Sequence, residues 1–368
     1  MTIEDIKKEI RWANIGEPFL LKSKNKVISV KIERASEPEN PREYFDPIGT
    51  MFCWHPRYRL GDWQQNNFST MEDALCNLVY DNVDDEMVID YIKTGKAKDI
   101  AFLVNEDGSL TWNCGYGEVT ITALDLSDEN KREEFLNDII HQLHPRDLVT
   151  LLEQSPKIVI MPIWMYEHSG ISLSTAHSYP YNDRWDSSCV GFVYTTKADG
   201  VKHGAWVDNF SDDEWHELAE EELRNEVKLY SAYLEDDVYE CSYSIWYGLN
   251  LDKMQLCARN GRPVYVTHKN DTSYWGIMDA QGYPNDCSNC CVHSWHDGKE
   301  RRDYLSTLGI VWEAFDVKVD VSENTPEARL ADGDGFTDPE YGGYYYGFDD
   351  ESISDMADFI GDALDIRR

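Results

Sequence analysis

Three apolar segments, IVIMPIWMY (158–166), ISLS (171–174) and CVGFVYT (189–195), decide the fold, and the acidic segment DDEWHELAEEELRNEVKLYSAYL (212–234) follows them. The apolar segments are rich in β-branched and aromatic residues and are separated by turn-forming residues, which predicts neighbouring strands of one antiparallel sheet. The acidic segment predicts a long amphipathic helix, because one stripe at helical spacing carries Trp215, Leu218, Leu223, Val227, Tyr230 and Leu234.

Outward from this region, a second long helix is expected from Ser127 to about His144, where Pro145 ends it. Shorter helices are expected after Thr2 and near the C-terminal end, the latter with Ile353, Met356, Ile360 and Leu364 facing inward. Strands mixed with unpaired helices favour an α+β fold of mainly antiparallel sheets with two longer amphipathic helices, in two or three subdomains. The expected division is an N-terminal α+β domain (1–155), an antiparallel sheet with the acidic helix (156–250) and a strand-rich acidic C-terminal region (251–368).

The chain is strongly acidic, with 69 Asp and Glu against 34 Lys and Arg and a formal net charge of −35 over 368 residues. Such a charge repels phosphate backbones, so direct binding to DNA or RNA is not expected. A hydrophobic content of 42% excludes a disordered chain. The sequence has no run of 18 apolar residues and its first twelve residues lack the apolar stretch of a secretory signal, so no membrane association is expected.

The cysteines indicate a reducing compartment. There are nine, an odd number, and they are scattered along the chain rather than arranged as a dense disulfide framework. Cys189, within an apolar strand-like run, is expected to be a small core residue. The sequence therefore predicts a cytoplasmic protein.

One cluster combines thiol and imidazole side chains: Cys287, Cys290, His293 and His296. These ligand types suit a tetrahedral zinc site. All of them lie within ten residues, whereas zinc sites usually separate two ligand pairs by a dozen or more. A cysteine-containing turn between strands is the favoured interpretation, so no cofactor is expected and zinc is the alternative.

A second group lies at the ends of the three strands: Tyr166, His168, Ser169, Trp185 and Asp186. Loops at strand ends often carry catalytic groups, and Ser, His and Asp are the residue types of nucleophilic hydrolysis. The chain has no nucleophile elbow, and the serines could equally satisfy the backbone of turns. A packed polar corner is favoured over a hydrolase-like or ligand-binding pocket.

The acidic residues of the 212–234 helix and of the segment after it form the main candidate surface. They are Asp213, Glu217, Glu220, Glu221, Glu222, Glu235, Asp236 and Asp237. Carboxylates one helical turn apart, about 5.4 Å, can imitate part of the phosphate ladder of a nucleic acid. Such a surface would steer onto the basic cleft of a nucleic-acid-binding protein, whereas the alternative is an acidic surface that serves solubility alone.

Two blocks carry a family resemblance: NPREYFDPIGTMFCWHPRYRLGD (40–62) and PIWMYEHSGISLSTAHSYPYNDRWDSSCVGFVY (162–194). They resemble blocks of uncharacterised proteins of tailed phages and mobile elements, and VKLYSAYLEDDVYE (227–240) is similar to the same pattern. Residues 250–368 have no counterpart in it. The resemblance implies a phage origin, hence host takeover or counter-defence, and carries over no catalytic residue.

Charge and resemblance together predict a phage-encoded anti-defence protein without catalysis, acting in the cytoplasm of the infected bacterium. It would inhibit a host defence protein, such as a nuclease, through a nucleic-acid-mimicking surface. The first alternative is an enzyme or small-ligand binder that uses the His168 and Asp186 corner. The second is a structural phage protein.

Overall fold

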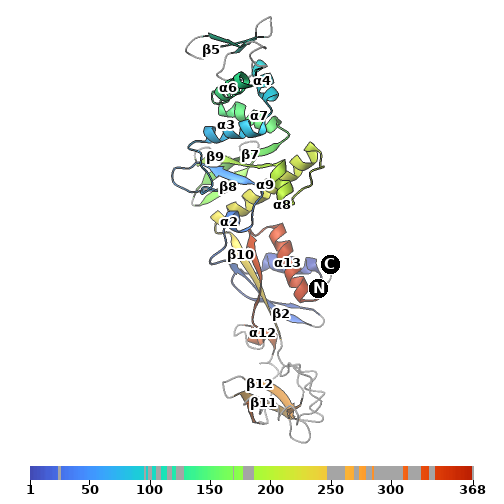
Figure 1. The fold of residues 1–368 in the computed structure, drawn as a ribbon. Helices are drawn as coiled ribbons and strands as arrows, with labels where there is room; N and C mark the ends of the chain where they lie inside the picture. Colours follow the sequence, from blue (N-terminus) through green and yellow to red (C-terminus); the bar gives the residue numbers. More distant parts are fainter. Residues whose placement is uncertain are drawn as a thin grey trace. The chain divides into compact units, whose positions relative to one another are not determined.

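The computed structural model describes residues 1–23, 26–94, 97, 102–104, 109–113, 118–121, 128–168, 170–176, 186–246, 262–268, 273–278, 284–285, 310–313, 325–330 and 336–366. They form an α+β fold (Figure 1) in which every strand pair described is antiparallel. The fold class expected from the sequence is confirmed.

Two compact units make up the chain, and each is described by itself. The first unit joins Met1–Pro38 to Asp237–Arg368, and the second unit is Glu39–Asp236. This grouping differs from the three consecutive segments expected from the sequence, because the first unit combines both ends of the chain.

The first unit contains a four-stranded sheet of order β1-β2-β10-β15, with β1 (Phe19–Lys22), β2 (Val27–Arg34), β10 (Val238–Ile245) and β15 (Glu340–Tyr346). Helices α1 (Ile3–Trp12) and α13 (Asp350–Ala363) contact each other and share one core with this sheet. The four inward residues expected for the C-terminal helix are all buried. The unit also contains α12 (Pro326–Arg329) and a sheet of β11 (Arg262–His268), β12 (Ser273–Met278), β13 (Pro284–Asn285) and β14 (Ile310–Glu313).

The second unit is built around a sheet of order β3-β9-β7-β8, with β3 (Thr50–Cys53), β7 (Ile158–Glu167), β8 (Ile171–Thr175) and β9 (Ser187–Thr196). Helices cover both of its faces (Figure 1), with α3 (Met71–Asn82) and α7 (Pro145–Gln154) on one and α9 (Asp212–Leu234) on the other. Alternate residues of β7 supply the two cores: Ile158 and Ile160 join α3 and α7, while Val159 and Met161 join α9. The expected antiparallel sheet and the bounds of the acidic helix are confirmed.

The remaining elements of the second unit are short. They are α2 (Pro41–Tyr44), α4 (Asp85–Lys93), β4 (Phe102–Val104), β5 (Leu110–Asn113), β6 (Glu118–Ile121), α6 (Glu129–Ile140) and α8 (Lys197–His203). Strands β4, β5 and β6 pair in that order as a three-stranded sheet.

Pro145 has a different role from the one expected. The helix predicted up to His144 ends earlier, as α6 at Ile140, and Pro145 begins the separate helix α7. His144 is the N-cap of α7, and its Nδ1 accepts the backbone N–H of Arg146 at 3.2 Å. Proline is tolerated in the first turn of a helix, because a backbone N–H at that position would have no intrahelical acceptor. The same residue that was expected to end one helix therefore begins the next.

Two burial expectations are wrong. Leu218 is 37% exposed, whereas Ala219 is buried. The next buried residue of α9 after Trp215 is thus four positions along the helix, at Ala219, and not three, at Leu218. Cys189 is exposed rather than a core residue. The register of β7 with β9 shifts between Ile163 and Trp164, so that Cys189 pairs with Trp164, and this β-bulge changes the face that Cys189 occupies.

Gly191, next to the bulge, is needed for the close approach of β3 and β9. A Cβ atom there would overlap the carbonyl oxygen of Phe52 and lie 2.8 Å from the Cα of Cys53. We expect Gly191→Ala to lower the free energy of unfolding by about 2 kcal/mol or more, because the backbone of β3 must shift. Gly170→Ala is the matched control, since a Cβ at Gly170 meets no atom within 4 Å. Equal urea midpoints for the two variants would contradict this account.

Candidate functional site

The acidic face of α9 is ordered by the way the helix begins and packs. Ser211 caps the helix, and its side chain and that of Glu214 form a reciprocal capping box. The apolar stripe that starts at Trp215 is buried against the sheet, so the opposite face is turned outward. Asp213, Glu217 and Glu221 follow one another at intervals of four residues, about 6 Å along the axis, and all three are exposed.

We call Asp213, Glu217 and Glu221 the acidic ridge. Within the described part of the chain, no Lys, Arg or His lies at ion-pair distance from any of them or from the neighbouring exposed Glu222. Their charges are therefore not neutralised by any of the side chains described. Three of the eight candidate partner-binding residues are thus brought together on one outward face, and a fourth, Glu222, is exposed about 100° further round the helix from Glu221.

The other four candidates do not extend the ridge. Glu220 forms an ion pair with Arg224 at 2.6 Å, and Glu235 accepts hydrogen bonds from the hydroxyls of Ser172 and Ser231 at 2.9 and 2.8 Å. Asp236 takes a φ of 55° just after the helix. Asp237 belongs to the first unit, where it accepts a hydrogen bond from Tyr239.

Several acids elsewhere in the described residues have structural partners. Asp84 pairs with Lys157 at 2.6 Å, and Arg132 bridges Asp85 and Glu86 at 3.0 and 2.7 Å. In the first unit, the side chain of Asp349 caps α13. Asp84, Asp85 and Glu86 thus join separate segments and Asp349 caps its own helix, in contrast to the residues of the acidic ridge.

The His168 corner is only partly described. Tyr166 and His168 stack with ring centroids 6.2 Å apart, and His168 is exposed. The backbone carbonyl of Asp186 accepts the N–H of Glu167 at 2.8 Å. Ser169 and Trp185 lie outside the described residues, so the arrangement expected for a hydrolase stays a prediction.

The ligands of the alternative zinc site, Cys287, Cys290, His293 and His296, also lie outside the described residues. Among the residues that the structure does describe, no group of three or more His, Cys, Asp or Glu side chains is arranged to hold a metal ion. Two histidines near α7 have structural partners: His144 caps that helix, and His141 Nδ1 lies 2.8 Å from the carbonyl oxygen of Asn137.

Arg42 forms a buried ion cluster that was not predicted from the sequence. Its guanidinium donates to both carboxylate oxygens of Asp62, at 3.1 and 2.6 Å, and to Glu226 Oε2 at 2.7 Å. It also donates to the carbonyl oxygen of Gly49 at 2.6 Å. The side chains of Arg42, Asp62 and Glu226 are only 2%, 9% and 13% exposed. We call these three residues the buried ion cluster.

The backbone completes the hydrogen bonding of this cluster. Glu226 Oε1 accepts the N–H groups of Ile48 and Gly49, at 2.8 and 3.1 Å, and Asp62 accepts the N–H of Met51 at 2.8 Å. Gly49 admits Glu226 to this position, because a Cβ there would lie 2.7 Å from Glu226 Oε2. The cluster therefore joins α2, the start of β3 and α9.

Burial and pairing act in opposite directions on the charges of the cluster. Burial acts to lower the pKa of Arg42, but its hydrogen bonds and attraction to Asp62 and Glu226 outweigh that effect and raise the pKa overall. Burial raises the pKa of Glu226, and the attraction of Arg42 offsets only part of the shift. Arg42 is thus held as a cation, and Glu226 depends on it to remain charged.

A sequence signal for the cluster existed. Glu226 is three residues after Leu223 and four before Tyr230, so it lies on the apolar stripe of α9. An acid in that position predicts a buried basic partner. That partner, Arg42, is 184 residues away in the sequence, so only the tertiary fold identifies it.

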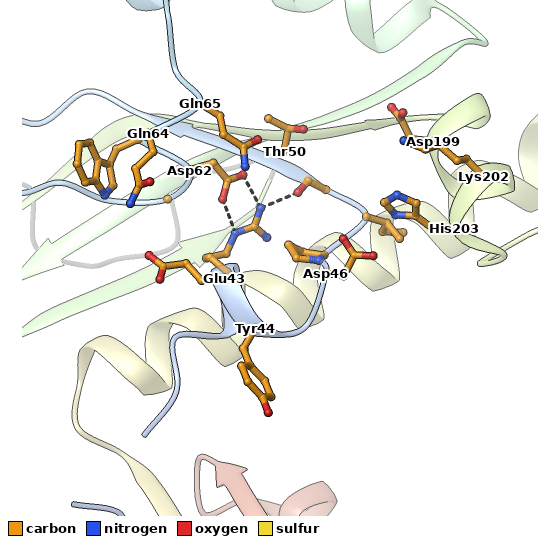
Figure 2. A pocket seen from close by; sticks show the side chains of 16 residues that line it. Glu43, Tyr44, Asp46, Thr50, Asp62, Gln64, Gln65, Asp199, Lys202 and His203 are labelled. Atoms are coloured by element: carbon orange, nitrogen blue, oxygen red, sulfur yellow. Dashed lines mark hydrogen bonds and ion pairs between the residues drawn. The ribbon is translucent and has the colours of Figure 1, made fainter. Parts of the chain in front are cut away.

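Arg42 and Asp62 of the cluster line a polar cavity of about 690 Å³ (Figure 2). Its walls come from the loop after α2, from Gly61–Gln65 and from α8, with the charged side chains Glu43, Asp46, Asp199, Lys202 and His203. Figure 2 shows Lys202 and His203 on the side of the cavity away from Gln64. Donors and acceptors of both charge signs suit a small polar ligand.

Comparisons with protein-family models, with curated proteins and with solved structures return no match. Within the part of the chain that is described, no helix has both the length and the apolar character needed to cross a bilayer.

Arg42→Met tests the cluster directly. We expect it to lower the free energy of unfolding by about 3–5 kcal/mol, because Asp62 and Glu226 lose their buried counter-charge. Arg224→Met is the control: it removes the exposed pair with Glu220 and should cost no more than about 1 kcal/mol. Urea unfolding followed by tryptophan fluorescence measures both, and similar losses in the two variants would rule out the assigned role of Arg42.

Proposed function

We propose that the protein acts by binding, without catalysis, and inhibits a nucleic-acid-acting protein through the acidic ridge of α9. The observation that carries this proposal is an ordered row of exposed carboxylates with no cation beside them in the described residues, on a chain of net charge −35. A surface that served solubility alone would need no such regular spacing.

The spacing of the ridge supports a partner that normally binds phosphates. Successive residues of the ridge are about 6 Å apart along the helix axis, whereas one strand of B-DNA carries a phosphate every ~3.4 Å of its axis, so the ridge can imitate part of the phosphate ladder at about half its linear density. The surrounding negative field would speed the encounter with a basic cleft. The resemblance of residues 40–62 and 162–194 to phage proteins favours a host defence protein, such as a nuclease, as the target.

The second candidate is a small-ligand binder, and the polar cavity above the buried ion cluster favours it. This cavity replaces the His168 corner as the better-described pocket of the second unit. A ligand bound in this cavity would leave the acidic ridge free. Substitutions in the cavity and substitutions in the ridge therefore distinguish the two candidate functions.

Charge reversal of the ridge is the decisive test. The triple variant Asp213→Lys, Glu217→Lys, Glu221→Lys should lose the capture of a nucleic-acid-binding protein from nuclease-treated bacterial lysate. The control variant Glu72→Lys, Asp81→Lys, Glu134→Lys changes the net charge equally, at exposed acids of α3 and α6, and should retain it. Duplex DNA should displace the captured protein. Equal capture by both variants, or a captured set without nucleic-acid-binding proteins, would refute the proposal.

The salt dependence of the captured complex gives an independent check. Exposed charges attract over a Debye length of about 10 Å at 0.1 M salt and much less at higher salt. We expect the dissociation constant, measured by calorimetry, to rise about tenfold or more between about 50 and 500 mM NaCl. An unchanged constant over this range would exclude the electrostatic mechanism.

A further inference from the structure

A second cavity of the second unit lies between the sheet and the helices α3 and α7, on the face opposite to α9. Its volume is about 420 Å³, and apolar side chains from both layers line it, among them Leu75, Val149, Trp164 and Phe192. Pockets for small molecules have volumes of about 300–1,000 Å³ and mostly apolar walls. This cavity has the dimensions and the surface of such a pocket.

The local structure of β7 and β9 shapes the wall of the cavity. Gly191 lines the cavity with backbone atoms alone, and the β-bulge places Cys189 opposite Trp164, where it also lines the cavity. The indole Nε1 of Trp164 donates to the carbonyl oxygen of Ala176 at 3.1 Å, which fixes the ring. The polar atom of the tryptophan is therefore satisfied, and the ring presents apolar surface to the cavity.

One cation stands at this cavity. Among the arginines described in the second unit, Arg42, Arg57, Arg132 and Arg224 pair with carboxylates, and Arg59 lies over the ring of Trp63. Arg146 lines the cavity, is exposed, and has no carboxylate of the described residues at ion-pair distance. Glu153 also lines the cavity, but it already has another interaction.

The position of Arg146 in α7 adds to this argument. It lies in the first turn, where the helix dipole disfavours a cation and favours an anion. Neither a described carboxylate nor the helix dipole offsets the charge of Arg146, although the chain has about twice as many acids as bases. A bound anion would pair with the guanidinium and would also interact favourably with the N-terminal end of α7.

We propose that this cavity binds a small amphipathic carboxylate, an apolar chain with one terminal acid group. The chain lies against Trp164 and Phe192, and the carboxylate accepts charge-assisted hydrogen bonds from Arg146. The site is on the opposite face of the sheet from the acidic ridge, so its failure and the failure of the proposed function are distinguishable.

Calorimetry with the full chain tests the site, using octanoate, decanoate and decanol as probes. Each methylene added to the carboxylate should tighten the dissociation constant about fourfold, because it buries further apolar surface. Decanol should bind about tenfold or more weakly than decanoate, since it lacks the charge that pairs with Arg146. Absence of decanoate binding at millimolar concentration would overturn the proposal.

Variants assign the binding to this cavity. Val149→Trp should fill the space and abolish binding, with circular dichroism as the check of folding. Arg146→Gln should reduce the affinity for decanoate to that for decanol and leave the affinity for decanol unchanged. Arg224→Gln, on α9, should change neither affinity. Equal affinity for decanoate and decanol, or an Arg146→Gln variant that binds decanoate normally, would overturn the carboxylate assignment.

A chemical measurement does not depend on the folding of a variant. Decanoate should slow the alkylation of Cys189 by iodoacetamide in the unaltered chain, measured peptide by peptide with mass spectrometry, because this thiol lines the cavity. An alkylation rate of Cys189 that decanoate leaves unchanged would place the ligand elsewhere and refute the site.

Discussion

The second unit depends on the contact of one arginine with two carboxylates. Arg42 holds Asp62 beside the start of β3 and Glu226 on α9 at the same time, and nearly all of its side chain is excluded from solvent. Such a cluster can add little net stability, because desolvation offsets attraction, but it specifies geometry strongly. The hydrogen bonds of Glu226 with the backbone of Ile48 and Gly49 fix the rotation of α9 about its own axis. In this orientation the acidic ridge faces outward.

The acidic residues of this chain therefore serve two different purposes. Asp62, Glu226, Asp84 and Glu86 are paired with cations and hold segments together. The ridge residues are spaced regularly on a helix face that packing keeps exposed. Like charges four residues apart repel one another and weaken a helix slightly, and the proposed cationic partner would relieve that repulsion.

Local patterns in the sequence were enough to predict the sheet strands, the bounds of α9 and the buried face of α13, because hydrophobic periodicity reports which side of an element meets the core. They could not predict the bulge that exposes Cys189, since the shift arises from pairing between β7 and β9. They also missed α7, because Pro145 is compatible with both an end and a start of a helix. For the site, the sequence predicted the ridge but not the partner of Glu226 or either cavity, which are made by residues far apart in the chain.

The sheet of the second unit separates the two proposed recognition surfaces, which differ in their chemistry. On the α9 face, exposed carboxylates act over a Debye length, depend on salt and need little shape complementarity for the first encounter. On the α3 and α7 face, an apolar cavity acts only through contact and gains with each buried methylene. Adjacent residues of β9 take part in both layers, Phe192 with the cavity and Val193 with the core under α9. Because strand residues alternate between faces, each surface can be altered by substitutions in its own helix layer while the shared strand remains intact.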